Sequence, residues 1–216
     1  MLKFDINIGK KKRDLLEKLD KAGCVMQTII FRVPYMPDDL YAASKQAAIE
    51  GMIYFNQQEY LQILSSIKND KLQSDKTLYP PVITGEPKGK RINFYEFIGT
   101  QKIVNNETIN LFGKVFDAYM SEFIYALLSP PYSMRFDKEY FPEIEGNKKE
   151  YVLNKYINEI LDIKTIKDID RLVIYKWSED WSDFFKEGKE WWGCYFWTVY
   201  NPITNNITVL GASTTD

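Results

Sequence analysis

The ten residues from Trp191 to Tyr200 constrain the fold of this 216-residue chain more than any other stretch. They include three tryptophans, two tyrosines and one phenylalanine. A run this rich in aromatic and β-branched residues predicts a β-strand. Alternate residues of a strand point to opposite faces. One face would carry Trp192, Cys194, Phe196, Thr198 and Tyr200, and the other Trp191, Tyr195, Trp197 and Val199. Both sets are largely apolar, so the sequence predicts a central strand covered on both sides.

The residues on either side of this run predict the rest of a sheet. Residues 201–206 have the composition of a turn, and Ile207–Gly211 reads as a returning strand. Upstream, Arg171–Trp177 predicts another strand. Between Arg171–Trp177 and the aromatic run, the sequence predicts a short helix over Asp180–Gly188, with Asp180 as its N-cap and Gly188 at its end.

Before residue 165 the apolar residues recur mainly with helical spacing. The predicted helices run over residues 10–22, 39–52, 56–67, 106–128 and 147–161, with Asn56, Asn106 and Asn147 as N-caps of the last three. Strands are predicted over residues 24–33 and, because Asn93, Tyr95 and Phe97 alternate with apolar neighbours, over 91–98.

Together these patterns predict a single α+β domain over residues 1–216. Its N-terminal two-thirds would be mainly helical and packed on an antiparallel sheet formed largely by the C-terminal region. Breaker and polar residues gather between 69 and 91, which marks that stretch as a long loop or a boundary between sub-domains.

Composition and charge exclude several classes of protein. The formal net charge is −2, whereas general nucleic-acid binders usually carry a basic excess. No run of about 18 apolar residues is present, so no membrane span is expected. The N-terminus lacks the apolar region of a signal peptide, which favours a cytoplasmic protein. Two free buried thiols at Cys24 and Cys194 suit that compartment, although a disulfide between them stays open.

The chain contains no histidine, and this removes the commonest catalytic base and most zinc sites. Gly85–Lys90 resembles a phosphate loop, but its glycines are one residue too close and Arg91 stands where Ser or Thr should be. No cofactor is therefore expected. The acids Asp137, Glu139, Glu143 and Glu145 lack the spacing of a calcium loop, so a solvated face is favoured over a metal site.

Two charged clusters remain as candidate sites. Lys10–Arg13 places positive charge at a helix N-terminus, either as a solvated end or as an anion or partner contact. The second cluster combines carboxylates with tryptophans: Glu179, Asp180, Trp181, Glu187, Glu190, Trp191 and Trp192. Paired acids beside aromatic rings can bind and hydrolyse carbohydrate. Capping acids beside a hydrophobic core would give the same pattern, and that interpretation is favoured.

The segment from Trp191 to Tyr200, with Ile207–Asp216 after it, resembles the C-terminal signature of an uncharacterised bacterial domain-of-unknown-function family. The resemblance covers about the last fifth of the chain. It implies a soluble cytoplasmic protein, and it carries no functional motif that could assign a site.

The sequence leaves three functional hypotheses. The favoured one is a non-enzymatic cytoplasmic binding protein of the immunity or antitoxin type whose partner is another protein, because surplus tryptophan and tyrosine often anchor interfaces. The alternative is a histidine-independent enzyme that acts on carbohydrate through two acids near Trp181–Trp192. In the third, every aromatic residue belongs to the core and the functional surface lies elsewhere. The oligomeric state is open.

Overall fold

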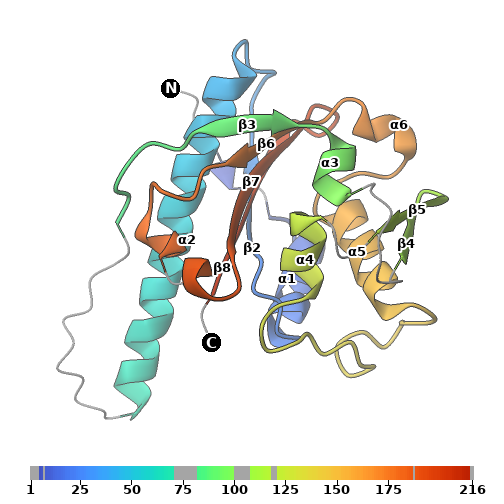
Figure 1. The fold of residues 1–216 in the computed structure, drawn as a ribbon, viewed down its shortest axis with the longest axis horizontal. Helices are drawn as coiled ribbons and strands as arrows, with labels where there is room; N and C mark the ends of the chain where they lie inside the picture. The colour runs from blue at the N-terminus through green and yellow to red at the C-terminus, as the bar shows by residue number, and fades with distance from the viewer. Residues whose placement is uncertain are drawn as a thin grey trace.

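The structure is a computed structural model that describes residues 5–6, 8–70, 82–99, 108–117, 121–186 and 188–214. A six-stranded antiparallel sheet runs through its middle (Figure 1). The strands, in their spatial order, are β1 (Asp5–Ile6), β2 (Gln27–Arg32), β8 (Asn206–Ser213), β7 (Cys194–Asn201), β6 (Val173–Trp177) and β3 (Gly89–Ile92).

Helices cover both faces of this sheet (Figure 1). The long helix α2 (Leu40–Asp70) lies on one face, where Ala47 and Phe55 join a buried cluster with strand residues such as Val209 and with Phe184 and Phe185 of the connection between β6 and β7. The opposite face is covered by the other α-helices: α1 (Lys10–Lys21), α3 (Phe94–Ile98), α4 (Glu122–Leu128), α5 (Lys148–Glu159) and α6 (Ile166–Ile169). The sheet therefore separates two hydrophobic cores.

Strand β7 lies at the centre of the molecule, as the aromatic run predicts. Phe196 and Tyr200 belong to the core under α2, whereas Trp197 and Val199 belong to the core on the other face. Strand β7 pairs with β8 on one side and β6 on the other. The only polar side chain within its aromatic run, Thr198, is buried and accepts a 3.0 Å hydrogen bond from the indole nitrogen of Trp177. The prediction of a central strand covered on both faces is confirmed.

The strand begins later than the sequence indicates. Gly193 has a φ of +123°, and a Cβ atom there would lie 2.5 Å from the Tyr195 hydroxyl oxygen. This left-handed residue interrupts the extended backbone, so Trp191 and Trp192 precede β7 instead of alternating within it. Trp192 accordingly packs against the core that contains Tyr195, and not with Cys194 as the alternation predicted.

Several N-terminal predictions are confirmed in outline. The 10–22 helix corresponds to α1 and the 24–33 strand to β2. Asn147 caps α5 by accepting a 3.2 Å hydrogen bond from the Glu150 backbone N–H. The two helices predicted over 39–52 and 56–67 are instead one helix, α2. Asn56 is buried within α2 and does not cap a helix, because α2 runs unbroken through that position.

The predicted 106–128 helix is wrong. Residues 108–117 form a hairpin of β4 (Thr108–Leu111) and β5 (Lys114–Asp117), with Phe112 and Gly113 at φ +53° and +73° in the turn. Two consecutive positive φ angles are typical of a type I′ hairpin turn. Helix α4 starts only after Ser121, whose hydroxyl caps the Ile124 backbone N–H. Asn106, the predicted N-cap, lies outside the described residues.

Two shorter predictions are also corrected. The strand predicted over 91–98 ends at Ile92, because Asn93 and Glu96 form a reciprocal capping box, with bonds of 2.8 and 2.9 Å, that starts α3. The helix predicted over 180–188 is instead a single 3₁₀ turn in its described part, η1 (Asp183–Phe185), which Ser182 caps in place of Asp180. A second 3₁₀ turn, η2 (Gly188–Glu190), begins at the residue where the helix was expected to end.

The α+β class is confirmed, but the mainly helical N-terminal two-thirds is not, since β1, β2, β3 and the β4–β5 hairpin all come from that part. The predicted loop over 69–91 lies partly outside the described residues, and its end is wrong because Gly89–Arg91 belong to β3. Its described end, from Val82, runs beside Trp181, with a 2.9 Å bond from the Thr84 N–H to the Trp181 carbonyl.

The basic run at the start of α1 has a structural role at Lys12. Its ammonium group lies 2.5 Å from an Asp162 carboxylate oxygen and 3.4 Å from the carbonyl oxygen of Ile160 at the C-terminus of α5. The side chains of Lys12 and Asp162 are only 17% and 20% exposed. A cation is favoured at a helix C-terminus, where the backbone dipole is negative. Lys12 therefore joins α1 to α5, whereas Lys11 pairs with Glu159 from a position that is 79% exposed.

We expect Lys12→Met to lower the free energy of unfolding by about 1–3 kcal/mol, because it leaves the Asp162 carboxylate half-buried without its partner. Lys11→Met is the matched control and should change it by less than about 0.5 kcal/mol, since exposed ion pairs contribute little. Urea denaturation of both variants measures the difference. Equal effects would show that the Lys12 contact does not stabilise the fold.

Gly51 lets α2 approach the sheet closely, since a Cβ atom there would lie 2.7 Å from a Val209 methyl carbon. In an exposed helix, Gly→Ala stabilises by about 1 kcal/mol. We expect Gly51→Ala to destabilise by about 1–3 kcal/mol through overpacking. Gly85→Ala is the control, because its Cβ would make an ordinary 3.6 Å contact with Trp181. A more stable Gly51→Ala protein in chemical denaturation would contradict this packing.

Candidate functional site

The carboxylates and tryptophans of the predicted site lie in the connection between β6 and β7, but they do not face one common space. Glu179 is half-buried, and its carboxylate lies 3.2 Å from the Cys194 sulfur, which donates the hydrogen bond. Burial and the Glu179 carboxylate raise the pKa of the Cys194 thiol to about 12. Cys194 is therefore protonated near neutral pH and is not an activated nucleophile.

Trp181 is a residue of the core. Its side chain is fully buried and packs edge-on against Phe185 and Phe196, with ring centres 5.7 and 5.4 Å away. Its indole N–H donates to the Ser178 carbonyl oxygen at 2.6 Å. A buried ring with a satisfied N–H offers no face on which a ligand could stack, so Trp181 anchors the connection to the sheet.

The remaining acids of the cluster are exposed where they are described. Asp180 and Glu190 both lie at the surface, and Glu187 lies outside the described residues. A hydrogen bond from the Ser178 hydroxyl, helped by Lys88 and Lys189, holds the pKa of the Asp180 carboxyl below its usual range. Asp180 is thus an ionised carboxylate at the surface. Its pKa is lowered, whereas a general acid needs a raised pKa.

In the second acidic set, Asp137, Glu139 and Glu143 are paired with basic side chains. Arg135 lies 3.2 Å from Asp137 and 2.7 Å from Glu139, and Lys155 lies 2.6 Å from Glu143. Hydrogen bonds from Lys155 and Tyr151 lower the pKa of Glu143 to about 2. Across the described ranges, no group of three or more acidic or cysteine side chains is placed to hold a metal ion.

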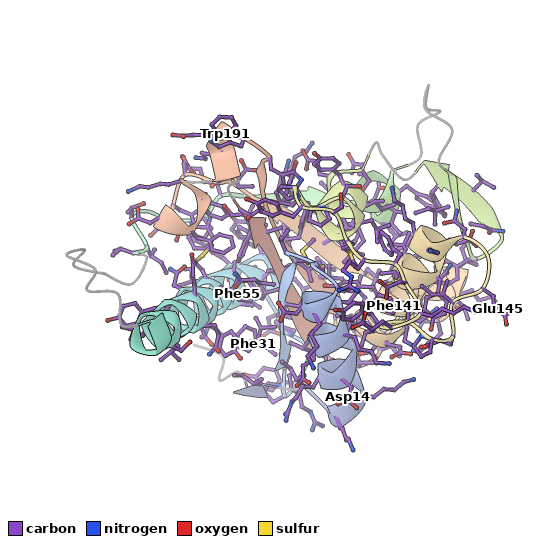
Figure 2. The ribbon with its side chains drawn as sticks, turned by 90° about the horizontal axis from the view of Figure 1, so that it is seen from below. Asp14, Phe31, Phe55, Phe141, Glu145 and Trp191 are labelled. Carbon is purple, nitrogen blue, oxygen red and sulfur yellow. The ribbon has the colours of Figure 1, made fainter. Side chains whose placement is uncertain are left out.

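The two tryptophans before β7 differ sharply in exposure. Trp192 is half-buried: its ring stacks on Tyr125 at 5.7 Å, and its indole N–H donates to the Ser129 carbonyl oxygen at 2.9 Å. Trp191 is 70% exposed and projects from the ribbon (Figure 2). We use the name Trp191 surface for this exposed ring together with the half-buried rings of Trp192 and Tyr125. It is the candidate functional site.

Sequence reasoning missed Tyr125 and Ser129 as partners of Trp192. The 106–128 segment was predicted as one core helix, so nothing indicated that its end would support the residues before β7. The helix-ending Pro130–Pro131 pair was the available signal, because it places Ser129 and its free carbonyl at the end of α4.

Both cysteines are free and buried, which answers the question that the sequence left open. Cys24 belongs to the core on the α1 side of the sheet and Cys194 to the core on the α2 side. The sheet itself keeps the two thiols apart.

We expect Cys194 to react with iodoacetamide at pH 8 at least about 100-fold more slowly in the native protein than in urea, because only the thiolate reacts. Glu179→Gln should speed the native reaction, since losing the carboxylate lowers the pKa and enlarges the thiolate fraction at a given pH. Mass spectrometry of the alkylated peptides separates Cys194 from Cys24. A native rate near the unfolded one would contradict the burial of Cys194.

None of the helices in the described parts of the chain has the length and apolar character needed to cross a lipid bilayer. Comparisons with protein-family models, curated proteins and solved structures found no match to this chain. The resemblance to a domain-of-unknown-function family therefore stays a hypothesis.

Proposed function

We propose that this chain is a non-enzymatic, cytoplasmic binding protein of the immunity or antitoxin type, which engages another protein through the Trp191 surface. The observation that carries the proposal is the 70% exposure of Trp191 in a protein whose Trp177, Trp181 and Trp197 are almost completely buried. Exposed tryptophan is uncommon on a free surface and is enriched among the residues that dominate the energy of protein interfaces.

The support behind Trp191 suits a binding surface. The backbone that carries Trp191 is held by the neighbouring Trp192, through its stacking on Tyr125 and its bond to Ser129. On the other side, the Gly193 N–H donates a 2.7 Å hydrogen bond to the Gly188 carbonyl. A backbone that is already fixed loses little entropy when its side chain is buried by a partner, which favours tight binding.

The chemistry of the chain favours binding over catalysis. The sequence has no histidine, and the pKa of each cysteine thiol is raised to about 12 by burial. Neither thiol is therefore available as a nucleophile near neutral pH. The proposed activity needs none of these groups, because an immunity or antitoxin protein acts by covering part of its partner.

The carbohydrate alternative has less support. A glycosidase needs two carboxylates on either side of one bond, commonly about 5–10 Å apart, and one of them needs a raised pKa. In the Trp181–Trp192 region, Glu179 is bonded to Cys194, and the pKa of Asp180 is lowered. Trp191 alone could stack on a sugar ring, which would make the chain a sugar-binding protein without hydrolytic activity.

The proposal is tested by replacing residue 191 with a photo-crosslinking phenylalanine analogue in the full chain, expressed in its native host. We expect irradiation to link position 191 to one other protein with a fixed stoichiometry of the two chains. Trp191→Ala should weaken that complex by at least about tenfold, as for an interface hot spot. Quantitative mass spectrometry identifies the cross-linked protein, and titration of the purified pair gives the affinity.

Val115 provides the matched control, because it is also an exposed apolar side chain, at 67%, on the distant β4–β5 hairpin. The same analogue at position 115 should give no specific cross-link, and Val115→Ala should leave the affinity unchanged. Equal cross-linking at both positions, or a complex that Trp191→Ala leaves intact, would refute the Trp191 surface as the binding site.

A further inference from the structure

Strand β3 is the last strand at one edge of the sheet, so the described strands pair with only one of its sides (Figure 1). The Ser178 N–H donates a 2.9 Å hydrogen bond to the Lys88 carbonyl oxygen just before the strand begins. Because the bonding residues alternate along an antiparallel pair, Gly89 and Arg91 direct their N–H and C=O groups away from β6. This edge therefore presents backbone donors and acceptors to a further strand.

One end of this outer edge is bonded and the other is open. The Gly89 N–H donates to the Tyr41 hydroxyl of α2 at 3.4 Å, as its direction away from β6 requires. Among the described residues, no group bonds to the N–H or C=O of Arg91. Exposed edge groups of this kind pair readily with an extended segment of another chain. The open part of the edge is thus centred on Arg91.

The side chains along this edge carry charge of one sign. Lys88, Lys90 and Arg91 are all exposed, and none of them forms an ion pair with a described residue. The whole chain has a net charge of −2, so the basic edge is a local feature. A second copy of β3 would bring like charges against these cations, which is unfavourable, whereas an acidic strand would complement them. The charges therefore favour an acidic partner over self-association.

The acids near this edge leave its cations available. Glu86 is paired with Lys45 at 2.7 Å, and the Glu96 carboxylate is bonded to the backbone at the start of α3. Asp180 feels the charge of Lys88 but accepts its hydrogen bond from a serine hydroxyl. A carboxylate of a partner would therefore meet cations that lack a close acid of their own.

A pocket of about 440 Å³ lies at the end of β3, and Arg91 and Ile92 belong both to the strand and to the wall of the pocket. Leu172 adds apolar surface, and Glu96 and Asp170 also line the pocket, so it suits an apolar side chain better than an acidic one. In strand addition, the backbone bonds supply affinity and neighbouring pockets supply specificity. The end of β3 thus offers a place for one apolar side chain of the added segment.

We propose that an acidic, extended segment of another protein adds to β3 as a seventh strand of the sheet. It would bond to the backbone of Arg91 and be attracted by the cations of Lys88, Lys90 and Arg91. This surface shares no residue with the Trp191 surface, so it does not rest on the proposed function.

The test uses the full chain and a fluorescein-labelled, end-blocked heptapeptide of alternating glutamate and valine. In one control peptide lysine replaces each glutamate. In the other, every peptide nitrogen is methylated, which keeps the charge and prevents strand pairing. Fluorescence anisotropy should show that the acidic peptide binds at least about tenfold more tightly than either control. At saturation, hydrogen exchange measured by NMR should slow at least about tenfold at the Arg91 amide, because its N–H then donates to the added strand.

Charge reversal on β3 shows whether these cations select the partner. Lys90→Glu combined with Arg91→Glu should weaken binding of the acidic peptide at least about tenfold and make the lysine peptide the tighter ligand. Residue 90 lies opposite Lys176, so a glutamate there meets a favourable charge, and the variant should fold normally. Urea denaturation checks this.

Lys10→Glu combined with Arg13→Glu is the matched control, because both side chains are exposed and the net charge changes equally. They lie at the start of α1, and the strand that follows α1, β2, is separated from β3 by β8, β7 and β6. At about 0.1 M salt, charges more than about 10 Å apart are largely screened, so this variant should change the affinity less than about twofold.

Each outcome decides the proposal. Tight binding of the acidic peptide with protection of the Arg91 amide supports strand addition. Equal binding of the methylated peptide would show charge attraction without strand pairing and would overturn it. An equal loss with the α1 variant, or no binding at millimolar acidic peptide, would also overturn it. Trp191→Ala should leave peptide binding unchanged, so failure of the protein-binding proposal leaves this one standing.

Discussion

The burial of β7 on both faces is the constraint on which the rest of the structure depends. A strand with Phe196 and Tyr200 on one side and Trp197 and Val199 on the other needs two apolar coverings, and helices supply both. The sheet therefore becomes a partition, with α2 on one side and α1, α3, α4 and α5 on the other. The closeness of α2 at Gly51 and the separation of the two thiols both follow from that partition.

The parts of the fold that local patterns determine could be predicted from the sequence. The density of aromatic and β-branched residues identified β7, and an asparagine before a helical stripe identified α5 through its Asn147 cap. Prediction failed where one pattern fits two structures. The apolar residues of the β4–β5 hairpin also fit a helical stripe, and the two structures differ through the left-handed Phe112–Gly113 turn. At Asn56 a residue with high cap propensity lies inside α2, because packing against the sheet outweighs a local preference.

The candidate site was predictable only as a list of residues. Sequence proximity grouped Trp181, Trp191 and Trp192, but their exposures depend on tertiary contacts. Trp181 is buried because the connection after β6 folds back onto Phe196, and Trp192 is half-buried because α4 places Tyr125 and Ser129 against it.

The pairing of β2 with β8 has a consequence for how the protein forms in the cell. Gln27 lies opposite Gly211 and Arg32 opposite Asn206, so β2, whose other neighbour is the two-residue strand β1, is paired along its whole length only with β8. During synthesis, nearly the whole chain has to leave the ribosome before the middle of the sheet can close. Helices α1 and α2 emerge early and expose apolar faces until that moment. A polypeptide that lacks β8 keeps these apolar faces uncovered, which favours aggregation over a smaller folded domain.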